Sequence, residues 1–239
     1  GDKVFGETTT SFGTNAEYVA VKAAGVIAHK PDFLTFQEAA TLTDGPLTSM
    51  NFLKNVAQLK LEQKILINGA SGSLGTAAVQ IARQMGAEVT GVSSTANLDL
   101  VKSLGAHHVI DYTREDFTKA KEQYDIIYDT IGKSSFSKSR KTLKPGGAYI
   151  SPVLKTGLMF QMIRTSIAGK KKAKFSATGM LKDEELSELL NELLLIIEKS
   201  DFKTIIDREY PLEQTAEAHA YISKGHKKGN VIVTVDHLN

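Results

Sequence analysis

A short turn of small residues carries the clearest chemical signal in this sequence. It spans residues 70–75, reads Ala-Ser-Gly-Ser-Leu-Gly, and lies between an apolar run at 65–67 and a helical run at 76–85. The first N–H groups of a helix have no partner inside the helix, and the helix dipole is positive at that end. Gly72 lets phosphates approach the backbone, and Gly75 lets the helix pack closely on the strand. The turn therefore predicts a site for the pyrophosphate of a dinucleotide.

Other glycine-rich or catalytic motifs fit this segment less well. A phosphate-binding loop of the Gly-Lys-Ser/Thr type is excluded because Gly75 is followed by Thr76, and a nucleophile elbow would need Gly in place of Ser73. Tyr18 and Lys22 have the spacing of a catalytic Tyr-Lys pair. They precede the turn, however, in a segment with strand-like alternation, so we interpret their spacing as accidental.

The residues that follow the second predicted strand bear on the type of cofactor. Sites for NAD usually place an Asp or Glu there, about 20 residues beyond the glycines, on the ribose 2′-hydroxyl. Residues 91–97 read Gly-Val-Ser-Ser-Thr-Ala-Asn, and the nearest acid, Asp99, lies in the next predicted helix. Hydroxyl and amide groups suit a 2′-phosphate, and no carboxylate repels it. This stretch favours NADP over NAD, although it contains no Lys or Arg.

The elements that must position the turn follow from the hydrophobic periodicity. From Phe36 onward, predicted helices at 37–42 and 47–57 precede an alternation of buried strands and helices, which is typical of a doubly wound parallel sheet. Short strands are also predicted at 3–5, 16–21 and 26–28, an amphipathic helix follows Lys182, and a final strand is predicted at 231–235. The six strands of the predicted α/β sheet are 64–68, 88–92, 108–111, 125–129, 148–151 and 174–178.

Composition excludes several classes of protein. The chain has 239 residues, is 41% hydrophobic and 23% charged, and contains no cysteine. Disulfide scaffolds, catalytic cysteines and thiolate metal sites are therefore excluded, and the histidines form no recognisable ligand set, so no metal site is predicted. No apolar stretch approaches the ~20 residues that cross a bilayer, and no signal-peptide pattern opens the sequence. We expect no membrane span, with a cytoplasmic location as the default.

The charge is unevenly distributed although the net charge is only +2. Residues 133–182 contain twelve Lys or Arg and no Asp or Glu. Such a region is either a solvated basic face or a site for nucleic acid, anionic lipid or a phosphorylated ligand. The solvated face is favoured, because the run of three lysines at 170–172 is too short to indicate nucleic acid by itself.

Matching stretches along almost the whole sequence resemble one known superfamily. They are residues 1–6, 16–21, 38–40, 47–48, 70–75, 103–106, 109–112, 125–132, 143–147, 225–226 and 229–230. Together they resemble the medium-chain dehydrogenase/reductase superfamily and, within it, the zinc-independent quinone oxidoreductase group. The resemblance implies a six-stranded Rossmann domain at 31–180. It also implies a partial β-rich, GroES-like catalytic domain formed by both chain ends, 1–30 and 181–239, with a further N-terminal β segment in the whole protein.

The resemblance also implies an activity and its residues. The implied reaction is NADPH-dependent reduction of a quinone or an α,β-unsaturated carbonyl by hydride transfer, in a homodimer that pairs through the last sheet strand. The catalytic residue stays unassigned, because hydride transfer from a cofactor has no obligatory acid or base. The implied cofactor contacts are Thr48 at the nicotinamide; Ser71, Gly72, Ser73, Leu74 and Gly75 at the pyrophosphate; Ser93, Ser94, Asn97 and Tyr112 at the 2′-phosphate; and Ile131, Gly132, Ser151, Pro152, Val153 and Asn230 elsewhere along the cofactor.

Two positions depart from the pattern of the group, and two other functions stay open. Asn97 stands where some relatives have a Lys, and Pro46 replaces a small residue. The alternatives are a relative of zinc-type alcohol dehydrogenases and an RNA-binding protein on a quinone-reductase scaffold. Metal analysis would distinguish the first alternative, and the salt dependence of RNA binding would distinguish the second.

Overall fold

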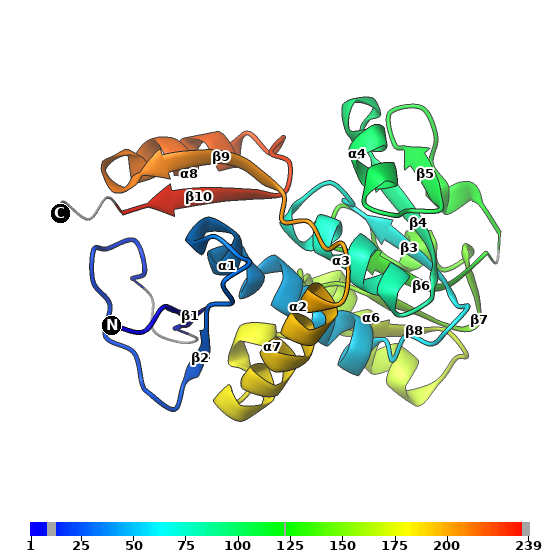
Figure 1. Cartoon of the computed structure of the whole chain (residues 1–239). Coiled ribbons are helices and arrows are strands. Elements are labelled where there is room, and N and C mark those ends of the chain that lie inside the picture. The colour runs from blue at the N-terminus through cyan, green and yellow to red at the C-terminus, as the bar shows by residue number, and fades with distance from the viewer. Residues whose placement is uncertain (9–12, 122, 236–239) are drawn as a thin grey trace.

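Apolar strands that alternate with helices build the centre of the molecule (Figure 1). The computed structural model describes residues 1–8, 13–121 and 123–235. Six strands form one sheet in the order β5-β4-β3-β6-β7-β8, and every neighbouring pair is parallel. They are β3 (Lys64–Asn68), β4 (Glu88–Ser93), β5 (His108–Asp111), β6 (Tyr124–Asp129), β7 (Leu143–Ile150) and β8 (Lys172–Lys174). The doubly wound α/β sheet predicted from the sequence is confirmed.

Helices cover both faces of this sheet because its strands are apolar on both sides. On one face Ile65 and Ile67 share a core with α2, α3 and α7, whereas on the other face Leu66 packs with Phe136 of α5 and Leu158 of α6. The helices are α1 (Phe36–Leu42), α2 (Gly45–Asn51), α3 (Ser73–Gln84), α4 (Leu98–Ser103), α5 (Phe136–Ser139), α6 (Thr156–Ile167), α7 (Asp183–Glu198) and α8 (Thr215–Ser223).

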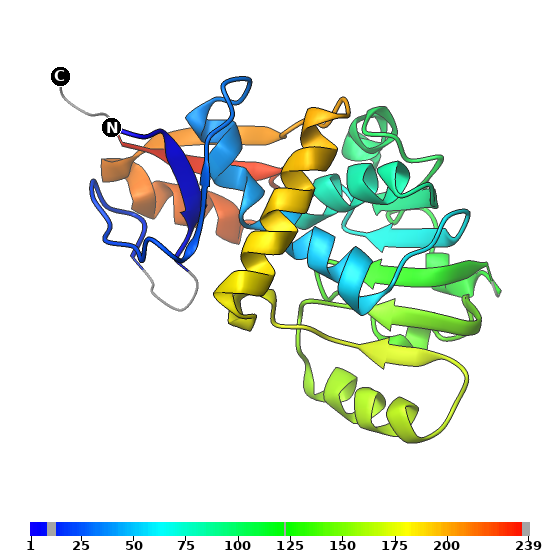
Figure 2. The same ribbon diagram turned by 60° about the horizontal axis from the view of Figure 1, so that its bottom comes forward.

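Two small sheets lie to one side of the six-stranded sheet (Figures 1 and 2). β1 (Val4–Glu7) pairs antiparallel with β2 (Val26–His29), and β9 (Ile206–Pro211) pairs parallel with β10 (Asn230–Thr234). In both views, the N-terminal strands and the C-terminal strands lie near each other, on the same side of the molecule. Among the described residues, no helix combines the length and the apolar character that crossing a bilayer requires.

Four sequence-based boundaries were wrong. The strand predicted at 148–151 begins five residues earlier, as β7 (Leu143–Ile150). The segment 16–21 forms no strand, and Tyr18 is 83% exposed. The helix predicted at 47–57 begins at Gly45 and continues beyond Asn51 as a π-helical segment, Phe52–Val56, which buries Phe52 and Leu53. The last strand is Lys172–Lys174 rather than 174–178, because the Asn51 side chain donates to Ser176 and Thr178 and holds them against α2.

Candidate functional site

The glycine turn lies between the carboxyl end of β3 and the start of α3. Gly69 has a φ of +83°, and Gly72 precedes the first residue of α3, where Thr76 donates its backbone N–H to the Gly72 oxygen at 2.9 Å. A Cβ on Gly75 would lie 2.1 Å from the Gly69 oxygen, so only glycine fits there. A Cβ on Gly72 would meet only that oxygen, at 3.5 Å. The two glycines therefore have the separate roles that the sequence indicates: Gly75 permits packing, and Gly72 leaves open space.

A hollow of about 520 Å³ opens at this turn, at the carboxyl ends of β3, β4 and β6. Seven of the sequence-predicted residues line it: Ser71, Gly72, Ser93, Ser94, Asn97, Tyr112 and Ile131. This hollow, called the dinucleotide cleft below, lies where open parallel sheets bind their ligands.

The remaining predicted residues support the wall of the cleft or lie beside it. Ser73 donates its hydroxyl to Asn230 Oδ1 at 2.6 Å, which joins the start of α3 to β10. Ser151 donates to the Asp129 carbonyl at 2.8 Å, and a Cβ on Gly132 would lie 2.8 Å from the Val153 side chain. None of the following lines the cleft itself: Thr48, Ser73, Leu74, Gly75, Gly132, Ser151, Pro152, Val153 and Asn230.

Polar side chains converge on Ser71 at one wall of the cleft. The Ser93 hydroxyl donates to the Ser71 hydroxyl at 2.8 Å, and the Asn97 amide nitrogen lies 3.3 Å from the same oxygen. Asn97 Oδ1 is buried and has no partner among the described residues. A buried polar atom without a partner is costly, and a ligand that donates a hydrogen bond would satisfy it. A ribose hydroxyl is such a donor, so this wall fits the adenosine half of a dinucleotide.

Cations that the sequence analysis did not assign also line the cleft. Lys133 and Lys138 come from the loop and helix after β6, and Lys227 and Lys228 come from the segment before β10. Two acids, Glu115 and Asp116, line it as well, so the lining carries more positive than negative charge. These lysines are far from the turn in sequence, and only the folded chain brings them to it.

A buried carboxylate fixes the loop on the far side of the cleft. Asp129, at the end of β6, is fully buried and accepts hydrogen bonds from Asn68 at 2.9 Å, from the Ser134 backbone at 2.8 Å and from the Tyr149 hydroxyl at 2.7 Å. Burial and this neighbouring carboxylate raise the pKa of Tyr149 far above its usual range, so the phenol keeps its proton. Sequence reasoning missed this role of Asp129, since its partners come from three other segments.

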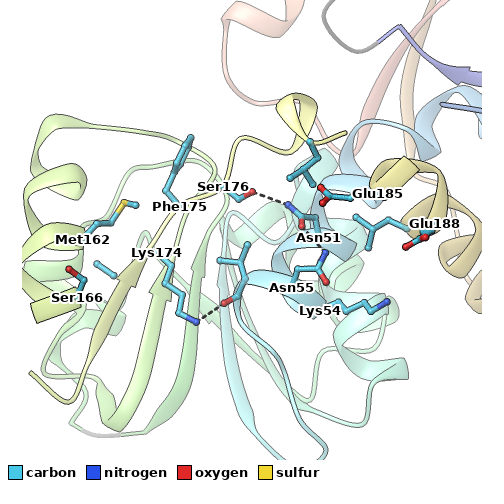
Figure 3. A pocket seen from close by; sticks show the side chains of 14 residues that line it. Asn51, Lys54, Asn55, Met162, Ser166, Lys174, Phe175, Ser176, Glu185 and Glu188 are labelled. Atoms are coloured by element: carbon cyan, nitrogen blue, oxygen red, sulfur yellow. Dashed lines mark hydrogen bonds between the residues drawn. The ribbon is translucent and has the colours of Figure 1, made fainter. Parts of the chain in front are cut away.

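A second hollow, of about 750 Å³, lies along the outer side of β8 (Figure 3). Residues of the Asn51–Val56 segment, α6 and α7 line it, and we call it the edge groove. Several of its polar side chains already have partners: Asn51 bonds Ser176, Lys174 donates to the Val56 carbonyl, and Lys54 pairs with Glu192. The dinucleotide cleft, which combines the glycine turn with the unpartnered Asn97 oxygen, is the candidate active site.

Comparison with known proteins identifies the family of the chain. The family model described as zinc-binding dehydrogenase matches residues 104–233, more than half of the chain. The chain belongs to this family. Zinc-binding dehydrogenases and the quinone and enoyl reductases that the chain matches are members of the medium-chain dehydrogenase/reductase superfamily, so the resemblance seen in the sequence is confirmed.

The relatives of this chain include a zinc-type alcohol dehydrogenase-like protein of Schizosaccharomyces pombe, 32% identical over 87% of this chain and 62% of the relative, and several proteins named as reductases. The chain is 31% identical to a 2-methylene-furan-3-one reductase of Solanum lycopersicum, over 98% of this chain and 57% of the relative. It is 30% identical to a chloroplast envelope quinone oxidoreductase homolog of Arabidopsis thaliana, over 98% of this chain and 72% of that protein. An alcohol dehydrogenase superfamily protein from Novosphingobium aromaticivorans has the same fold, with a TM-score of 0.82 at 26% identity, over 99% of this chain and 76% of that one.

The described residues do not supply the zinc site that the family name implies. The sequence has no cysteine, and within the described ranges no group of three His, Asp or Glu residues could hold a metal ion. A dinucleotide, in contrast, fits the open space at Gly72 and the unpartnered Asn97 oxygen.

Proposed function

We propose that this chain binds NADPH in the dinucleotide cleft and that the protein reduces a quinone or an α,β-unsaturated carbonyl. The observation that carries the proposal is the open cleft at Gly72, where the first N–H groups of α3 lack partners inside the helix and the sheet ends. Relatives named as quinone and furanone reductases support the reaction class. The chain spans 57% of the length of the tomato relative, and the activity is proposed for the whole protein.

In this proposal the protein mainly binds the cofactor and the substrate and orients them toward each other. When bound, the nicotinamide cofactor supplies the hydride. The backbone of residues 72–75 holds the pyrophosphate, and the Ser71–Ser93–Asn97 cluster holds the adenosine ribose. The loop fixed by Asp129 carries Ile131 on the opposite wall, and Thr48 in α2 positions the nicotinamide. Holding donor and acceptor in one geometry and excluding water account for the rate enhancement.

The preference for NADPH over NADH rests on charge. No carboxylate follows β4 within residues 93–97, and Lys133 and Lys138 line the same cleft. A 2′-phosphate would meet hydroxyls, an amide and cations, whereas the ribose 2′-hydroxyl of NADH would find no carboxylate at that strand end.

One experiment tests this proposal. The intact protein is assayed for oxidation of NADPH and NADH against a panel of quinones, enones and simple aldehydes. We expect NADPH oxidation with quinones or enones and a lower kcat/KM with NADH. Oxidation with saturated aldehydes alone would contradict the proposed substrate class, and equal kcat/KM values for the two cofactors would contradict the preference for NADPH.

A further inference from the structure

The segment before β10 forms a wall of the dinucleotide cleft by docking on the glycine turn. The Gly229 N–H donates to the Ser71 carbonyl at 2.8 Å, and Gly229 pairs in parallel with Gly72. The next residue, Asn230, accepts the hydroxyl of Ser73 at 2.6 Å. The backbone at 229–230 is therefore fixed against the first residues of α3.

Lys227 is the cation that this docking brings to the start of α3. Its ammonium donates to the Gly229 carbonyl at 2.5 Å, so the charge lies beside the residue that pairs with Gly72. The side chain is half-buried and lines the cleft. The carboxylates of Asp44 and Asp207 attract the ammonium, but neither forms an ion pair with it, for which the nitrogen and an oxygen would have to lie within 4.0 Å.

Two positive features therefore face the same space. The start of α3 is the positive end of its dipole, and the Lys227 ammonium is partly removed from water next to it. Burial lowers the pKa of Lys227, because partial removal from water makes the charged ammonium less favourable. A cation near a helix N-terminus is unfavourable unless an anion lies between them.

We propose that Lys227 binds the diphosphate of the dinucleotide, across from the N–H groups of α3. This inference rests on the proposed function and deepens it. The diphosphate is common to NADPH and NADH, so Lys227 contributes equally to the affinity for both. The 2′-phosphate is on the adenosine ribose, which the proposed function places at the cluster around Ser71 and Asn97. Selectivity between the two cofactors is therefore independent of Lys227.

The neighbouring residue provides a matched control. Lys228 carries the same charge and lines the same cleft, but its side chain is exposed, and its backbone N–H donates to Asp207 at 3.2 Å. A general electrostatic attraction for anions would involve both lysines alike. A specific contact with the diphosphate would involve Lys227 alone.

The test is calorimetric titration of the intact protein and its variants with NADPH, NADH and adenosine 2′-monophosphate, which has no diphosphate. For Lys227→Met we expect NADPH and NADH to bind more weakly by the same factor, about 10- to 100-fold, the usual scale for a charged hydrogen bond. Binding of adenosine 2′-monophosphate stays unchanged, Lys227→Arg recovers most of the affinity, and Lys228→Met has a much smaller effect.

Five results would overturn the inference. Loss confined to NADPH and adenosine 2′-monophosphate would place Lys227 at the 2′-phosphate instead. Equal losses of dinucleotide affinity in the Lys227→Met and Lys228→Met variants would show a general electrostatic attraction without a specific contact. Weaker binding of all three ligands by Lys227→Met, together with a lower melting temperature of that variant, would show a structural role for Lys227. Wild-type protein that binds neither dinucleotide would refute the proposed function as well, whereas normal dinucleotide binding by Lys227→Met refutes only this inference.

Discussion

Gly72 is the residue at which ligand binding can be separated from folding. Its backbone is extended and a Cβ there meets nothing closer than 3.5 Å, so Gly72→Val should fold. The branched side chain would occupy the space where phosphates approach the turn. We expect an unchanged circular dichroism spectrum and an affinity for NADPH at least about tenfold lower, the loss of one good polar contact or more. Calorimetry on the folded variant checks this, and wild-type affinity would show that the diphosphate binds elsewhere.

Glu7, on β1, makes stability depend on pH. Burial raises its pKa, and the nearby carboxylates Asp44 and Asp183 raise it further. The folded state therefore binds a proton more tightly than the unfolded state, and stability falls as pH rises from the usual pKa of a glutamate through the raised one. Glu7→Gln should raise the melting temperature near pH 7, by up to about 3 °C in a chain of this size, and should have little effect near pH 4.

The control for this prediction is an exposed glutamate. Glu17→Gln changes the net charge by the same amount at an exposed site. A stabilisation of equal size in both variants would mean that net charge, rather than the surroundings of Glu7, is responsible. Stabilisation by Glu7→Gln that persists at pH 4 would also contradict the argument from ionisation.

At the scale of single residues, the sequence pointed to some of the residues that line the candidate cleft. The turn and Ser71, Ser93 and Asn97 could be found because they follow two successive strands, whose carboxyl ends meet at one edge of a parallel sheet. Lys227 and Asp129 gave no local signal. Their positions depend on hydrogen bonds to segments far away in the sequence, which periodicity does not report.

The packing of α3 on β3 depends on the absence of a side chain at Gly75. A Cβ on Gly75 would lie 2.1 Å from the Gly69 oxygen and 2.6 Å from the Ala70 Cα, and both belong to the backbone. Gly75→Ala should therefore destabilise the fold by about 1–3 kcal/mol or more, as overpacking does. Gly157→Ala is the matched control, because a Cβ in that first turn of α6 meets nothing within 4 Å.

Urea unfolding of both variants measures the difference. Gly157→Ala should be neutral or stabilising by up to about 1 kcal/mol, since alanine restricts the unfolded chain. If Gly75→Ala unfolds at the same urea concentration as the wild type, α3 can shift on the sheet, and the proposed geometry of the pyrophosphate site would need revision.

Two elements that the sequence predicted correctly are continuously buried. β3 and β4 contain runs of buried residues, and their predicted boundaries agree with the structure to within one residue. The errors include 16–21, which forms no strand, and 174–178, of which Lys174 alone belongs to a described strand. Whether such a stretch pairs depends on what lies beside it, and that information is not local.

At the scale of the whole molecule, the edge of the sheet is the surface expected to join two copies. α6 exposes Phe160, Ile163 and Ile167, which are 64%, 62% and 83% exposed. Two other residues of this helix, Met162 and Ser166, line the edge groove (Figure 3). β8 is short, and the Thr165 hydroxyl already accepts the Ala173 N–H at 3.1 Å. We therefore propose that a homodimer rests on the apolar face of α6 more than on strand pairing.

Light scattering at micromolar concentration tests this dimer. The wild type should have the mass of two chains, and Ile163→Lys should shift it toward one chain without loss of the fold. Leu195→Lys, on the exposed side of α7, introduces the same charge at a residue that is 51% exposed and should leave the mass unchanged. A monomeric wild type at moderate salt would refute the proposed interface.

The bond between Ser73 and Asn230 joins residues 157 positions apart, and this separation sets an order of events during synthesis. The glycine turn leaves the ribosome long before residues 225–228, which line its cleft, so a growing chain lacks that wall of the cleft. In the proposed function, full affinity for the dinucleotide arises only after this segment has docked on the turn. Because a ligand that binds only the native state stabilises it, the cofactor would protect finished molecules and leave interrupted or clipped ones exposed to proteolysis.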